Sequence, residues 1–226
     1  MNSPQRDLSS PPLDVSEAYD LAAPLYDAWK WQALWRAAEL PFIRAVLEPQ
    51  GPARLLDVGC GTGWYLQHLS PWCAEAVGVD LSQGMLAQAR RRLPEAELVQ
   101  ADARDLPFGE GRFDLVLSTR VLSHIAGPEA ALAEARRVLR PGGLVVVSDV
   151  DAAHPYAHTR LPVDQGHVLA HSYKHPRAQI EALFEAQGFA SVGAALISPE
   201  GTVSAAAHLG MLAEAPIVGW ISAWRG

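Results

Sequence analysis

Glycines alternate with other residues at Gly59, Gly61 and Gly63, directly after an apolar run that ends in Val58. Glycine lets the backbone turn sharply and approach a ligand closely, because no Cβ stands in the way. The following WYLQHL has a helical pattern, and the amino end of a helix presents N–H groups without partners. We interpret 55–69 as a strand, a ligand-binding turn and a helix, a weak signal by itself because dinucleotide sites use a similar turn.

Two aspartates follow later expected strands, where an acid can bind a ligand. Asp80 ends the run AVGVD, seventeen residues after Gly63. An acid at the end of the second strand of a doubly wound fold can bind the hydroxyls of a ribose, although Asp80 could instead cap the next helix. Asp102 follows the expected strand 97–101, and a lone aspartate in such a place is usually a turn former.

His124 is the candidate for proton transfer in the central part of the sequence. A neutral imidazole, with a pKa near ~6.5, can take up a proton around neutral pH. His124 comes shortly after the expected strand 113–118, whose carboxyl end also carries Ser118 and Thr119. Ligands of open α/β sheets collect at such strand ends. A purely structural role for His124 remains the other interpretation.

The spacing of the glycines distinguishes between two classes of nucleotide site. A nicotinamide-dependent oxidoreductase would carry the pattern G-x-G-x-x-G, with glycine or alanine at or near Tyr65. The sequence reads GCGTGWY there, with an aspartate, Asp57, two residues before the first glycine. The oxidoreductase is therefore a disfavoured alternative.

The glycine turn and four further segments resemble the class I S-adenosylmethionine (SAM)-dependent methyltransferases. The segments, in this order, are LLDVGCGTG (55–63), VGVDLS (77–82), QADA (100–103), FDLVLS (113–118) and RVLRPGG (137–143). Together they cover about residues 50–150. The resemblance implies SAM as cofactor and an α/β fold with a doubly wound seven-stranded sheet, in the strand order 3-2-1-4-5-7-6 with the last strand antiparallel.

The resemblance also implies which residues bind the adenosine part of SAM. Asp80 would take the ribose, and Asp102 would accept a hydrogen bond from the adenine amino group. The backbone N–H of Ala103 would serve a ring nitrogen. Leu81 and Met85 would sandwich the adenine, although a methionine on a helix is more often core filling.

The methionine end of SAM would lie nearer the glycine turn and the lid. The resemblance places Asp57, Gly59, Cys60 and Gly61 in the turn that holds the cofactor, and Ser118 and Thr119 near the sulfonium. A tyrosine of the amino-terminal lid would face the methionine end, Tyr26 as the first candidate and Tyr19 as the second. In some relatives a histidine at the place of His124 faces the acceptor atom.

The helical, aromatic-rich segment 15–49 is expected to form this lid, with Pro24 and Pro41 breaking it into separate helices. A buried helical layer without ligand contacts is the other interpretation of its aromatic residues. Residues 1–14 are rich in proline and serine, and we expect a mobile arm. The remainder, 15–226, is expected to be a single domain.

Five of the eight histidines lie in the insertion 151–176. A metal site, an acceptor pocket and a connector are the three interpretations. Zinc would require compact ligand pairs supported by further ligands, and no cysteine is near, so we expect no metal site. Relatives build substrate specificity after the fifth strand, which makes His171 and Tyr173 pocket candidates, together with Trp29 of the lid.

Composition limits the function classes. The chain has 226 residues, of which 49% are hydrophobic and 19% charged, as expected of a globular protein. A formal charge of −7 argues against a nucleic-acid partner. No run reaches the ~18 apolar residues of a membrane span, the first residues lack the apolar core of a signal peptide, and the two cysteines do not suggest a disulfide framework. We expect a cytoplasmic monomer or homodimer.

These observations predict an enzyme that transfers the methyl group of SAM to the oxygen or nitrogen of a small apolar or aromatic metabolite. The other function compatible with the motifs is a module that binds SAM without catalysis. The filled cofactor positions argue against a decayed site.

Overall fold

A computed structural model describes residues 11–51, 53–199, 201–204 and 217–226 of the chain, with backbone only for 201–204. Its helices are α1 (Val15–Ala22), α2 (Trp31–Leu47), α3 (Trp64–Leu69), α4 (Gln83–Arg92), α5 (Glu129–Val138) and α6 (Arg177–Ala186). Short 3-10 helices are η1 (Tyr26–Ala28), η2 (Glu48–Gln50), η3 (Ser70–Trp72) and η4 (Leu122–His124). The strands are β1 (Ala53–Val58), β2 (Cys73–Asp80), β3 (Glu97–Gln100), β4 (Phe113–Thr119), β5 (Leu139–Val150), β6 (Thr159–Val163), β7 (Gly166–Ala170), β8 (Ala190–Ser198), β9 (Gly201–Ser204) and β10 (Gly219–Arg225).

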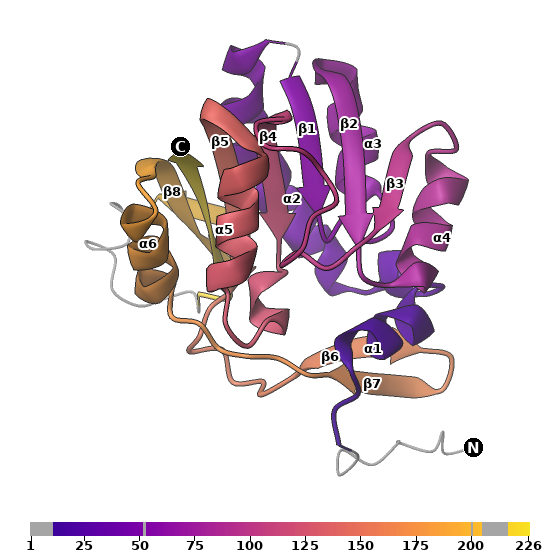
Figure 1. The fold of residues 1–226 in the computed structure, drawn as a ribbon. Coiled ribbons are helices and arrows are strands. Elements are labelled where there is room, and N and C mark those ends of the chain that lie inside the picture. Colours follow the sequence, from indigo (N-terminus) through magenta and orange to yellow (C-terminus); the bar gives the residue numbers. More distant parts are fainter. Residues whose placement is uncertain (1–10, 52, 200, 205–216) are drawn as a thin grey trace.

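The central sheet has the order β3-β2-β1-β4-β5-β10-β8-β9 (Figure 1). The pairs from β3 to β5 are parallel, whereas β10 runs antiparallel to both β5 and β8. Counted without the edge strand β9, this is the expected seven-stranded order 3-2-1-4-5-7-6, with β10 as the antiparallel last strand. The α/β fold predicted from the sequence is confirmed.

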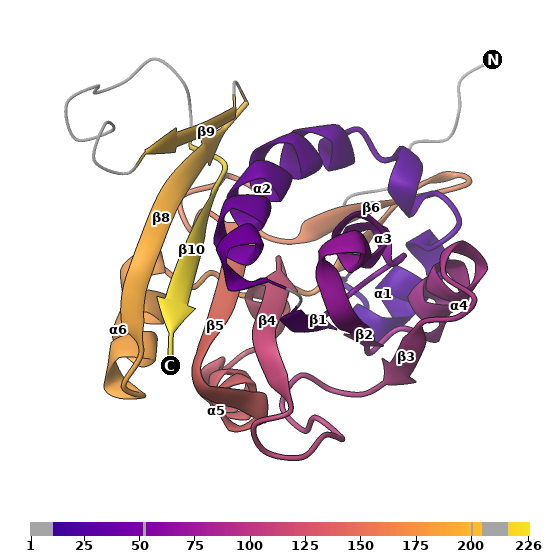
Figure 2. The same ribbon diagram turned by 90° about the horizontal axis from the view of Figure 1, so that it is seen from above.

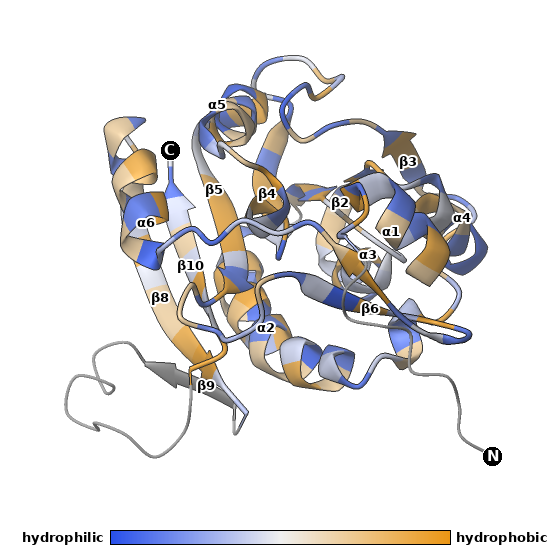
Figure 3. Cartoon of the chain, turned by 90° about the horizontal axis from the view of Figure 1, so that it is seen from below, coloured by the Kyte–Doolittle hydropathy of each residue, from blue (hydrophilic) through white to orange (hydrophobic). Residues whose placement is uncertain are grey.

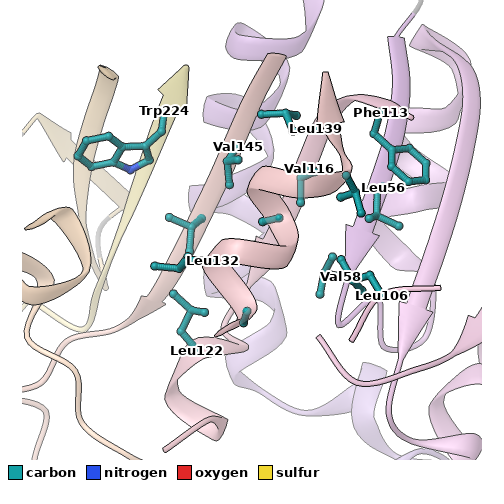
Figure 4. Close-up of a cluster of buried hydrophobic side chains, with 14 of the residues drawn as sticks. Leu56, Val58, Leu106, Phe113, Val116, Leu122, Leu132, Leu139, Val145 and Trp224 are labelled. Atoms are coloured by element: carbon teal, nitrogen blue, oxygen red, sulfur yellow. The ribbon is translucent and has the colours of Figure 1, made fainter. Parts of the chain in front are cut away.

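Helices cover both faces of this sheet because successive side chains of a buried strand point to opposite sides. Leu56 and Val145 pack with α5 and α6 in one core cluster, and Leu55 and Val146 pack with α2 and α3 in another. Figure 2 shows α5 on one side of the sheet and α2 and α3 on the other, and Figure 4 shows the first cluster around Leu132. The parallel strands therefore end together at one edge of a layered core.

Pro41 lies inside α2, so the prediction that it breaks the helix is wrong. A proline inside a helix costs about 3 kcal/mol through the lost hydrogen bond and a steric clash. Pro41 is exposed, whereas Trp35, Ile43 and Leu47 on both sides of it are buried against the sheet. Burial of this apolar face holds the helix continuous across the proline.

A separate layer covers the carboxyl ends of the parallel strands. It consists of α1 and the antiparallel hairpin β6–β7, which lie together below the sheet in Figure 1 and in front of it in Figure 3. Ala18 and Ala22 of α1 pack against Leu161 and Ala170 of the hairpin. The lid is thus built jointly from the expected helical segment and part of the insertion 151–176.

The expected mobile arm, 1–14, is described only from residue 11 onward. Leu13 pairs with β7: its N–H donates to the oxygen of Leu169 (2.8 Å), and the N–H of His171 donates to its oxygen (3.2 Å). This described part of the arm is held in place by the hairpin. Within the described residues, no helix is both long and apolar enough to cross a bilayer.

Candidate functional site

A large cavity lies where β1, β2 and β4 end beneath the lid. Its volume is about 540 Å³, within the range of ~300–1,000 Å³ typical of small-molecule sites. Predicted site residues that line it are Tyr19, Tyr26, Gly59, Gly61, Asp80, Leu81, Asp102, Ala103, Thr119, His124, His171 and Tyr173. Residues far apart in the sequence therefore meet in one crevice.

The glycine turn forms the floor of this cavity in a backbone conformation that side chains disfavour. Gly59, Gly61 and Gly63 have φ values of 74°, 54° and 75°, in the left-handed region that glycine adopts without strain. A Cβ on Gly59 would overlap Val121, and a Cβ on Gly61 would point toward the Tyr26 ring, 3.9 Å away. The turn thus leaves a cradle that any side chain at Gly61 would begin to fill.

Asp80 links the glycine turn to the start of α4. Its Oδ2 accepts from the N–H of Gly61 and its Oδ1 from the N–H of Ser82, both at 2.8 Å. Each carboxylate oxygen can accept a second hydrogen bond, so both have capacity left for a pair of hydroxyl groups. Burial raises the pKa of Asp80 to about 6.

Asp57 does not line the cavity but is buried beneath it at the end of β1, with 1% of its surface exposed. Neither carboxylate oxygen has a hydrogen-bond partner among the described residues. Burial, and next the charge of Asp80, raise the pKa of Asp57 to about 8. The carboxyl group is therefore mostly protonated near neutral pH in the ligand-free protein, and a cationic ligand beside it would favour the charged form.

His124 is held between the lid and the segment after β7. Its Nδ1 lies 2.9 Å from the carbonyl oxygen of His171, and its Nε2 lies 2.8 Å from the Tyr19 hydroxyl. A carbonyl only accepts, so Nδ1 carries the hydrogen and Nε2 accepts from Tyr19. Burial lowers the pKa of His124 and raises that of Tyr19 well above its usual value. The pair is therefore a neutral imidazole with a protonated phenol in the cavity wall.

Tyr26 is positioned above the glycine turn by its neighbour Asp27. Asp27 accepts hydrogen bonds from the Thr62 hydroxyl (2.9 Å) and from Arg92 of α4 (2.5 Å). Burial by itself would raise the pKa of Asp27, but the hydrogen bonds from these donors outweigh it, so the pKa is lowered. The ion pair and the hydroxyl bond thus fix the lid to the turn that it covers.

Helix α1 is fixed to α4 in a similar way. Asp20 Oδ1 accepts from the Ser82 hydroxyl (2.5 Å) and from the N–H of Gly84 (2.7 Å). A Cβ on Gly84 would approach the Asp20 backbone to 2.9 Å, so glycine is required for this close contact. Asp20 and Asp27 were not singled out from the sequence, where acids in a helical segment read as solvated groups.

Arg120 is a cavity residue that sequence analysis missed. It follows Thr119 at the end of β4 and lines the cavity. Among the non-glycine residues that the structure describes, it is the one with a positive φ, 58°. Its guanidinium pairs with Glu39 of α2, which is fully buried and also accepts from Tyr65 and from the Ser148 hydroxyl (2.5 Å). The strained backbone is held by this buried network, which connects α2 to the ends of β4 and β5.

The side chain of Asp102 is engaged with its own loop. It accepts from the backbone N–H, the Nε and the Nη2 of Arg104 at 2.8, 2.9 and 2.6 Å. The Arg104 bonds lower the pKa of Asp102. Asp102 therefore stays charged beside Ala103 and Leu81, and a ligand amino group would share it with Arg104.

Other predicted site residues lie outside this cavity. Asp57 is one of them, as described above. Met85 is another: it is fully buried in the core, consistent with the core-filling alternative. Cys60 is buried near Gly78, and burial raises the pKa of its thiol well above its usual value. Ser118 lies on the α5 side of β4, since alternate residues of a strand face opposite sides and Thr119 takes the cavity side. Trp29 lines a second cavity.

The histidine-rich segment forms the hairpin β6–β7 and its flanks. Within the residues that the structure covers, no three His, Cys, Asp or Glu side chains gather as a metal site would require. The ring centroids of His158 and His171 are 5.1 Å apart, and those of His171 and Tyr173 are 4.7 Å apart. These rings form an aromatic wall rather than a ligand cage.

Comparisons with known proteins identify relatives of this chain. Residues 56–147 match the family model described as "Methyltransferase domain". The chain is 32% identical over 148 residues to an uncharacterized methyltransferase of Synechocystis, covering 57% of this chain and 68% of that protein. It is 38% identical over 152 residues to the demethylmenaquinone methyltransferase of Clavibacter sepedonicus, covering 63% of this chain and spanning 60% of that relative's length.

A solved structure has the same fold. The S-adenosylmethionine dependent methyltransferase from Mesorhizobium loti superimposes with a TM-score of 0.67 at 24% identity, over 85% of this chain and 100% of that one. At this identity the likeness establishes the fold alone, whereas the sequence relatives establish the family.

Proposed function

The chain belongs to the SAM-dependent methyltransferases, and from this premise we propose that it binds SAM in the 540 Å³ cavity and methylates a small apolar or aromatic molecule. The observation that carries this proposal is the convergence of the glycine turn, Asp80, Tyr26 and His124 on that cavity. Each comes from a different element, and each has a chemical use there.

The residues present fit the cofactor. The free lone pairs of Asp80 suit the two ribose hydroxyls, and Asp102 with the Ala103 N–H suits an adenine edge. The oxygens of the buried Asp57 have no partner among the described residues, and a ligand that carries a sulfonium and an ammonium group would favour the charged form of this carboxyl group. Tyr26 would lie over the methionine end, because it faces Gly61 across the cradle.

Bound SAM supplies an activated methyl group, so the chain's own task is to align the acceptor and to keep water out. Tyr26, Tyr19 and the hairpin β6–β7 cover the strand ends and exclude solvent. The bonds of Asp20 and Asp27 to α4 and to the glycine turn hold this cover closed.

For a hydroxyl acceptor, a proton must leave as the new bond forms, and His124 is the base that we propose. Tyr19 occupies its Nε2 in the structure, so His124 acts through the Tyr19 hydroxyl. The acceptor's proton passes to the Tyr19 oxygen while the Tyr19 proton passes to Nε2. His124 becomes an imidazolium, the form that the charge of Asp149 favours. For an amine acceptor, the same pair would only shape the pocket.

A small-molecule acceptor is supported by the size of the cavity and by a relative named for demethylmenaquinone. The aromatic lining, with Tyr26, Tyr173 and His171, favours an apolar or aromatic compound. The formal charge of −7 supports the absence of a nucleic-acid substrate. We also propose a cytoplasmic location, supported by the two cysteines that are free in the structure, and a monomer or homodimer as the assembly.

Incubation with SAM labelled in its methyl group and a panel of phenols, quinols and amines tests the activity. We expect a labelled product from at least one acceptor class, with the demethylated cofactor formed in equal amount. Binding of SAM with no labelled product from the panel or from a metabolite extract would favour the non-catalytic module instead.

A further inference from the structure

A second cavity, of about 210 Å³, lies beside the first, between the start of α2 and the insertion 151–176. Indole and phenol side chains line it, among them Trp29, Trp31, Trp35 and Tyr173. Tyr173 also lines the first cavity, so the two share a wall. A dry cavity of ~150 Å³ is enough to bind benzene, so this one has room for a substituted ring.

The charged groups around this cavity are mainly cationic. Lys30, Arg160 and Lys174 line it, and none forms an ion pair with a carboxylate of the described residues. The Nε of Arg160 is buried with no hydrogen-bond partner within the described part of the chain. The acid in the lining, Asp151, already accepts from the N–H of Ala153 (2.8 Å).

The pKa values of two histidines in the lining are lowered in part by these same cations. Burial, and next the charge of Lys174, lower the pKa of His154 although Asp151 opposes them. Burial, and next the charges of Arg160 and Lys30, lower the pKa of His167. Lys30 and Lys174 are exposed to solvent, and the amino group of Lys174 also donates to the carbonyl oxygen of His154. The Nε of Arg160 is buried and has no partner among the described residues, and a bound anion would supply one.

We propose that this second cavity is the recognition pocket for the methyl acceptor and that it holds an aromatic ring carrying an anionic group such as a carboxylate. The part of this proposal that assigns the pocket to the methyl acceptor rests on the proposed function. The indole faces bind the ring, and Arg160 and Lys30 bind the anion. The shared Tyr173 wall would orient the other end of the acceptor toward Tyr19 and His124.

Calorimetric titration with cinnamate, its neutral amide cinnamamide, and acetate separates the contributions of charge and ring. We expect cinnamate to bind at least about tenfold more tightly than either of the others, because it alone has both features. In Arg160→Gln and Lys30→Gln, cinnamate affinity should fall about tenfold or more while cinnamamide affinity stays constant. Arg91→Gln, an exposed cation of α4, is the matched control and should change neither.

Titration of the same variants with S-adenosylhomocysteine (SAH), the demethylated cofactor, tests the fold and the proposed function separately. SAH should bind wild type and variants equally. Equal affinity for acid and amide, acetate binding as tight as that of cinnamate, or an unchanged preference in both cavity variants would overturn the pocket assignment. Failure of wild type to bind SAH would instead overturn the proposed function, whatever the cinnamate result.

Discussion

The Tyr19 hydroxyl donates to His124 Nε2 across 2.8 Å, joining two residues 105 positions apart in the sequence. Helix α1 therefore completes the hydrogen-bonding shell of the candidate base, and the proposed proton transfer requires Tyr19 to stay in this position. A lid that opened would leave Nε2 to solvent.

With a hydroxyl acceptor, His124→Gln and Tyr19→Phe should each slow turnover by about 10²-fold, the usual effect of losing an acid–base group. Both residues act on one proton, so the double variant should be little slower than either single variant. Steady-state kinetics measure the rates, and SAH titration should show nearly unchanged affinity. Multiplicative losses would show that the two residues act independently.

The pH profile of wild-type turnover follows from the same pair. Burial lowers the pKa of His124, so the imidazole stays neutral and able to accept a proton until the pH falls below its ordinary value of 6.5. We predict an acid limb of kcat below that pH, which disappears in His124→Gln. An acid limb above neutrality in wild type would contradict this assignment.

Gly61→Ala should abolish cofactor binding without unfolding the protein. The new Cβ would enter the space below Tyr26, and the left-handed backbone would cost about 1–2 kcal/mol. Gly188→Ala is the matched control, because Gly188, just after α6, also has positive φ (81°) but no atom within 4 Å of a built Cβ. Both should lose similar stability in thermal unfolding, and only Gly61→Ala should lose SAH affinity. Equal SAH affinity in both would show that the cradle is not used.

Asp57 should make the ligand-free protein less stable as the pH rises. Its folded pKa, about 8, lies above the unfolded value of 3.8, so the folded state binds the proton more tightly and loses that advantage as the pH rises through about 8. Asp57→Asn should therefore flatten the decline in unfolding free energy between about pH 4 and pH 8. Asp102→Asn should leave this decline unchanged, because Arg104 lowers the pKa of Asp102 out of that range. Urea unfolding across this range measures both, and an unchanged slope in Asp57→Asn would contradict the prediction.

Removal of the Glu39 carboxylate should destabilise the fold strongly. Glu39→Ala leaves Arg120 without its partner and Tyr65 and Ser148 without their acceptor, and breaking a buried ion pair costs about 3–5 kcal/mol. The control is Glu48→Ala, at an exposed position at the end of α2. Its free energy of unfolding should stay within about 0.5 kcal/mol of the wild-type value. Similar unfolding midpoints for the two variants would show that the network contributes little.

The sequence allowed the sheet and the glycine turn to be predicted because local patterns determine them. Buried parallel strands are continuous apolar runs such as LVVVS, and a left-handed turn requires glycine. The Pro41 prediction failed because tertiary burial of α2 outweighed a local rule. The hairpin β6–β7 was missed since its strands alternate weakly. Residues 205–216 lie outside the described residues.

Long-range polar partners could not be read from the sequence. Nothing at Glu39 signals that it pairs with Arg120, 81 positions later, and the role of Asp27 depends on how the lid folds back onto Thr62. At the end of β4, the choice between Ser118 and Thr119 depended on which face of the strand meets the lid. Strand alternation shows that only one of them can reach the cavity, and the structure identifies Thr119.

Calorimetric titration of SAH into wild type and Asp80→Asn tests the assignment of the cofactor cavity most directly. We predict saturable binding to wild type with one site per chain. In Asp80→Asn the affinity should fall at least about tenfold, because a charged acceptor for the ribose hydroxyls is lost. No heat of binding to wild type at millimolar SAH, or equal affinity in the variant, would contradict the placement of the cofactor against Asp80.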